Sequence, residues 1–92
     1  MKKEKASLEL NNIRIYYGEH LLYRGPLSNV PIREASIIEK SIEFFDDPEP
    51  CYIHRGAVKA RILSELERCF TGDTLDLQTS QIPFGLLECL AL

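Results

Sequence analysis

Alternating apolar and polar residues near the start of the chain predict a β-hairpin. The alternation runs over residues 8–17 and changes phase at Asn11-Asn12, where we expect a bulge or turn to absorb one residue. Gly18-Glu19 has the composition of a tight turn, and residues 20–24 return as a second strand. Because a two-stranded hairpin is marginal alone, it should pack on helices or gain a third strand.

A helical pattern follows over residues 32–45, with Pro31 placed in its first turn. Its apolar residues spread over nearly half of the helical wheel, which is wider than a one-sided helix needs. We therefore expect this helix to contact two bodies: the hairpin on one side, and the second helix or a partner subunit on the other.

A second helix, with one clean apolar face, is predicted from Arg55 or Gly56 to Phe70. The prolines of residues 46–50 form a stiff corner between the two helices. Residues 51–53 form a short strand or an extended link, and Gly72 is the expected left-handed cap of the second helix.

The last part of the chain is less sharply patterned. Residues 73–81 are polar, with Leu75 and Leu77 alternating, as in a short edge strand. Residues 86–92 are strongly apolar and fit either a last strand or a short helix. The order of elements predicts an α+β fold, with the helices on one face of a small antiparallel or mixed sheet. We expect residues 1–7 to be a flexible basic tail and residues 8–92 to form a single domain.

Composition narrows the classes of function. Apolar residues make up 45% of the 92 residues, as in an ordinary globular protein. The formal net charge of −3 argues against nucleic-acid binding as a general property. No apolar run approaches the ~20 residues that span a bilayer, and the basic N-terminus lacks the apolar stretch of a signal peptide. We expect a cytoplasmic protein that does not enter the membrane and needs no cofactor.

The start of the second helix carries an unusual cluster of positive charge, where the helix dipole disfavours it. His54, Arg55, Gly56 and Lys59 are candidates for an anion site, because free backbone N–H groups at a helix start bind anions. Such a site could take a phosphate, a nucleic-acid backbone or an acidic segment. Alternatively, the basic residues only pair with Asp46, Asp47 and Glu49 across the corner.

Metal binding and catalysis find little support in the sequence. Cys51, His54, Cys69 and Cys89 are ligand types for zinc, but their spacing is irregular and no second knuckle is present, so we expect no metal site. No catalytic motif is found, and nothing marks a paired cysteine and histidine. The sequence predicts a protein without enzymatic activity.

The apolar content of the first helix and of the C-terminal segment is high for so short a chain. This excess favours a small protein-interaction or regulatory domain, either a homodimer or the binder of another protein. Its interface candidates are Ile37, Phe44, Leu87, Leu90 and Leu92. The alternative function is binding of an anion or nucleic acid at the basic start of the second helix.

Overall fold

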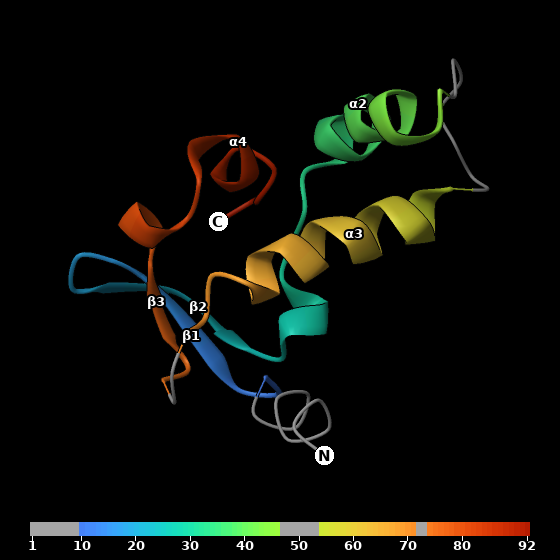
Figure 1. Cartoon of the computed structure of the whole chain (residues 1–92). Helices are drawn as coiled ribbons and strands as arrows, with labels where there is room; N and C mark the ends of the chain where they lie inside the picture. Colours follow the sequence, from blue (N-terminus) through green and yellow to red (C-terminus); the bar gives the residue numbers. More distant parts are fainter. Residues whose placement is uncertain (1–9, 47–53, 72–73) are drawn as a thin grey trace.

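A computed structural model describes residues 10–46, 54–71 and 74–92 (Figure 1). These residues form a three-stranded mixed sheet with helices, which confirms the α+β class. In chain order the elements are β1 (Ile13–Tyr17), β2 (His20–Gly25), the 3₁₀ turn η1 (Leu27–Asn29), α2 (Glu34–Phe45), α3 (Arg55–Glu67), β3 (Asp76–Gln78), the 3₁₀ turn η2 (Thr79–Gln81) and α4 (Phe84–Leu87).

The predicted hairpin is present, and it contains a register shift that was not predicted from the sequence. β1 and β2 pair antiparallel across Gly18-Glu19, with Gly18 at a φ of 62° that favours glycine. The register shifts between Ile15 and Tyr16, so the extra residue is Leu22 of β2. The turn that was one of the two alternatives predicted at Asn11-Asn12 is present, because Leu10 and Asn11 form a turn and β1 begins only at Ile13.

The third strand that the hairpin required comes from the C-terminal part of the chain. β3 pairs parallel to β1, giving the sheet order β2-β1-β3. The side-chain amide of Gln78 fastens this strand to the hairpin turn: its oxygen accepts the Gly18 N–H at 3.0 Å and its nitrogen donates to the Gly18 carbonyl at 2.9 Å. Arg14 Nε lies 2.6 Å from the Asp76 carboxylate, close enough for an ion pair although the groups are not aligned for a hydrogen bond.

The first helix begins two residues later than the sequence predicts. Ile32 is bridged to Leu90, and the backbone N–H of Arg33 donates to the Cys89 carbonyl at 2.8 Å. These contacts hold the chain extended, so Pro31 does not stand in the first helical turn. At the other end, Asp46 adopts a left-handed conformation with a φ of 54° and its N–H donates to the Ile42 carbonyl at 2.8 Å, which ends the helix.

The C-terminal segment, predicted as either a strand or a short helix, contains a short helix followed by an extended residue. Residues 84–87 form the short helix α4, and Leu90 then bridges to Ile32 as an extended residue. The predicted second helix is confirmed from Arg55 but ends at Glu67, and residues 68–70 form a turn. The predictions for the corner prolines, for residues 51–53 and for Gly72 as a cap lie outside the described residues, as does the predicted tail.

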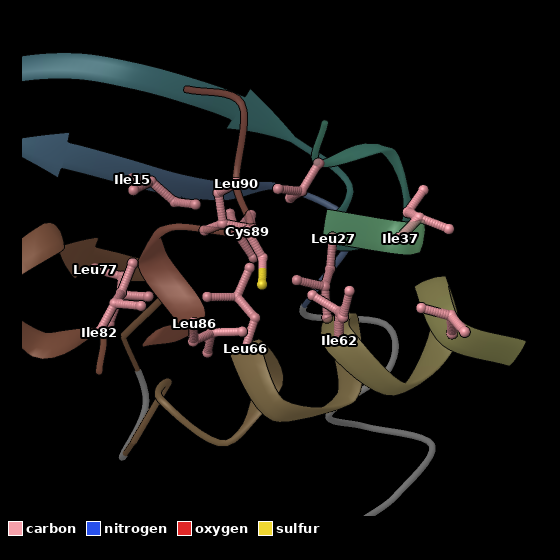
Figure 2. Close-up of a cluster of buried hydrophobic side chains, with 13 residues drawn as sticks. Ile15, Leu27, Ile37, Ile62, Leu66, Leu77, Ile82, Leu86, Cys89 and Leu90 are labelled. Atoms are coloured by element: carbon pink, nitrogen blue, oxygen red, sulfur yellow. The ribbon is translucent and has the colours of Figure 1, made fainter. Parts of the chain in front are cut away.

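The core lies between the sheet and two of the helices. Ile13, Ile15 and Leu77 of the sheet are at most 2% exposed, and α3 contributes Val58, Ile62 and Leu66. Figure 2 shows Leu86 and Cys89 directed into the same cluster. α3 and α4 lie on the same side of the sheet, whereas α2 packs mainly against α3 and away from the sheet (Figure 1). Of the two contacts predicted for the first helix, the one with the second helix is therefore present and is its main contact.

Candidate functional site

A shallow apolar groove lies between the hairpin and the C-terminal segment. The bulge in β2 and the end of β1 contribute to its lining, together with the first residue of η2, the residue before α2 and the C-terminal residues from Leu87 onward. Its volume is about 460 Å³. The residues that line it are Tyr17, Leu22, Arg33, Thr79, Leu87, Leu90, Ala91 and Leu92. We call this surface the hairpin groove.

Several apolar side chains of the hairpin groove remain open to solvent. Tyr17 is 66% exposed, Leu22 39% and Leu92 38%. Leu87 is half-buried and Leu90, at 5%, belongs to the core. Exposed apolar side chains that gather beside a recess are typical of binding surfaces, whereas isolated ones are ordinary.

Arg33 is the single charged residue among those that line the hairpin groove. Its backbone is fixed by the C-terminal segment, and its exposed side chain makes no ion pair with any of the residues that the structure describes. A cation without a counterion at an apolar recess can pair with a carboxylate that a bound partner brings.

The five predicted interface residues divide between core and surface. Leu87 and Leu92 line the hairpin groove together with the buried Leu90. Ile37 is only 3% exposed and lies in the core cluster, so its side chain is already covered within one chain. Phe44 is half-buried, with the Arg61 guanidinium stacked 3.9 Å from its ring centroid.

The hairpin residues Tyr17 and Leu22 and the cation Arg33 were not among the interface residues predicted from the sequence. One signal for them was available. Neighbouring side chains of a strand point to opposite faces of the sheet, so the adjacent leucines of residues 21–22 cannot both face the core. One of them must therefore bulge or face solvent. The groove itself depends on the C-terminal segment folding back on the hairpin, which local periodicity does not encode.

A second exposed apolar surface lies on α2. Ile38, Ile42 and Phe45 are 38%, 47% and 38% exposed and follow helical spacing along one side. The Phe45 ring stacks on the His54 ring, with centroids 4.2 Å apart and planes inclined by 8°. The exposed apolar residues on this side of α2 agree with the wide apolar distribution seen in the sequence.

The basic start of α3 is engaged by an acidic residue from α2. Glu34 forms an ion pair and hydrogen bond with Arg55, and this contact, helped by the charge of Lys59, holds the pKa of Glu34 below its ordinary value. Gly56 and Lys59 are exposed and His54 is half-buried beside Phe45. The structure thus brings the four anion-site candidates together, with a carboxylate already among them.

A wider hollow of about 730 Å³ near the end of α3 has a mixed polar lining that includes Lys40 and Cys69. Hydrogen bonding to Glu43 raises the pKa of Lys40. Burial, followed by the nearby charge of Glu65, raises the pKa of the Cys69 thiol, which makes this group a weak nucleophile at neutral pH.

Among the described residues, no three His, Cys, Asp or Glu side chains gather as a metal site would require. Cys51, which the zinc alternative needs, lies outside them. No described helix is long and apolar enough to cross a bilayer. Comparisons with protein families, with curated proteins and with solved structures find no match for the chain.

Proposed function

We propose that this chain is a small, non-enzymatic protein-interaction domain of the cytoplasm that docks its partner in the hairpin groove. The observation that carries the proposal is the gathering of the exposed side chains of Tyr17, Leu22 and Leu92 around one recess. Burial of apolar surface contributes roughly 25 cal/mol per Å², so such a recess gains free energy when a partner covers it.

The hairpin groove supports protein binding better than small-molecule chemistry. It is shallow and open, and it carries one charged group and no cluster of titratable side chains. Small-molecule sites usually enclose most of their ligand and converge several polar groups on it. Protein interfaces instead combine an apolar centre with a few charges near the edge.

Site-specific photo-crosslinking in the native host tests this function. A benzophenone side chain at Tyr17 stands at the recess and, because this position is 66% exposed, leaves the core intact. The matched control carries the same group at Glu39, an exposed position of α2 outside the groove. We expect covalent adducts heavier than the monomer from Tyr17 and few from Glu39.

The mass of the adduct identifies the partner as this chain or another protein. Equal crosslinking from both positions, or none from Tyr17, contradicts the assignment of the groove as the docking surface.

A further inference from the structure

An exposed aromatic side chain stands next to the hairpin groove. Phe84, at the start of α4, is 74% exposed, which is the highest exposed fraction of any large apolar residue that the structure describes. It precedes Leu87, which lines the groove, by three residues, so the two lie on one side of the short helix. The same small element therefore carries both a projecting ring and part of a recess.

Two opposite charges flank this element. Arg33 lines the groove, and its N–H bonds the Cys89 carbonyl, so it lies against the turn that holds Glu88. Glu88 is exposed, and neither it nor Arg33 has an ion-pair partner among the described residues. The two segments thus present charges of opposite sign to solvent, neither of them paired within the part of the chain that the structure describes.

A patch that holds a projection, a recess and both signs of charge is complementary to itself. In a twofold dimer the same patch serves both copies, so each contact occurs twice and the assembly closes. A different partner would need only one member of each pair on this chain, and would leave the other exposed.

We infer that the occupant of the hairpin groove is a second copy of this chain. The copies meet about a twofold axis, with Phe84 of each seated in the groove of the other and Arg33 paired with the partner's Glu88. This inference rests on the proposed function, because it names the partner of the same surface. Aromatic anchors seated in a recess commonly dominate the energy of such interfaces.

Charge reversal tests the reciprocal pairing. The variants Arg33→Glu and Glu88→Arg each place like charges opposite one another twice, so we expect either to weaken self-association about tenfold or more. An equimolar mixture of the two restores attraction at both contacts and should return the dimer to wild-type affinity as a heterodimer. Sedimentation equilibrium over a range of concentrations measures all three, and circular dichroism verifies folding.

Two further variants complete the experiment. Phe84→Ala should weaken the dimer about tenfold or more, whereas the control Glu39→Arg, on α2, should leave it unchanged. A dimer that the mixture fails to restore overturns the twofold arrangement. A chain that stays monomeric at millimolar concentration, while the group at Tyr17 crosslinks to a different protein, overturns the second copy as occupant but leaves the proposed function standing.

Discussion

At the scale of single residues, the Ser41 hydroxyl is a buried polar group without a hydrogen-bond partner among the residues that the structure describes. Ser41 lies on the buried side of α2, and its exposed fraction is 0%. Among the described residues no hydrogen-bond partner faces its oxygen. A buried polar atom without a partner loses its bonds to water and regains nothing, at a cost of about 1–3 kcal/mol.

Ser41→Ala should therefore stabilise the protein. Removing the hydroxyl recovers the desolvation cost, and alanine adds about 0.5 kcal/mol of helix propensity. The expected gain in the free energy of unfolding is about 1.5–3.5 kcal/mol, measured by urea denaturation. Ser64→Ala, at an exposed position of α3, changes the propensity alone and serves as control. A Ser41→Ala variant less stable than wild type contradicts this account.

At the scale of elements, an ion pair joins the starts of the two longer helices. Because the contact with Arg55 lowers the pKa of Glu34 in the folded state, the pair stabilises the fold above the ordinary carboxyl pKa. That stabilisation is lost as pH falls through the lowered pKa. Since both side chains are largely exposed, the effect is modest and sensitive to salt.

Glu34→Gln should remove this part of the acid sensitivity. We expect the variant to be less stable than wild type at pH 7 and the difference to shrink as pH falls below about 4, the ordinary carboxyl range. Thermal melts from pH 7 to pH 3 at low salt make the comparison, with Glu39→Gln of the same helix as control. A difference that stays constant across this range argues against a charge-dependent contact.

Elements with strong local signals were predictable from the sequence. The glycine turn fixed the hairpin, and the apolar face of residues 58–66 fixed α3. The boundaries that failed were set by contacts distant in the chain: the C-terminal segment pairs with Ile32 and delays α2. Part of the lining of the hairpin groove was predicted, because Leu87 and Leu92 belong to a strongly apolar segment of the sequence. Tyr17, Leu22 and Arg33 are distant in the sequence and come beside them only when the chain folds.

At the scale of the whole molecule, two features oppose general binding of nucleic acid: the negative net charge, and the ion pair already formed at the basic start of α3. The chain carries a formal charge of −3, and its basic helix start already holds the Glu34 carboxylate. A phosphate backbone attracts proteins mainly through a surplus of lysine and arginine. The apolar groove is thus a stronger basis for function than the cluster of His54, Arg55 and Lys59.

We expect neither a single-stranded nor a duplex oligonucleotide to bind at 50 mM salt, as measured by fluorescence anisotropy up to 100 µM protein. Binding that weakens steeply with added salt, and that disappears in the double variant Arg55→Ala and Lys59→Ala, would instead support the anion site. The charge-preserving variant Arg55→Lys and Lys59→Arg is the matched control for that result.

The parallel pairing of β3 with β1 has a consequence for the route by which the chain folds. Arg14 lies opposite Asp76, so the sheet closes only after a loop of about sixty residues, including both longer helices, has been gathered. The hairpin and the helices can form from neighbouring residues, whereas this pairing must wait. During synthesis, β1 therefore emerges long before its second neighbour exists, and its open edge is exposed to other chains until the last strand arrives.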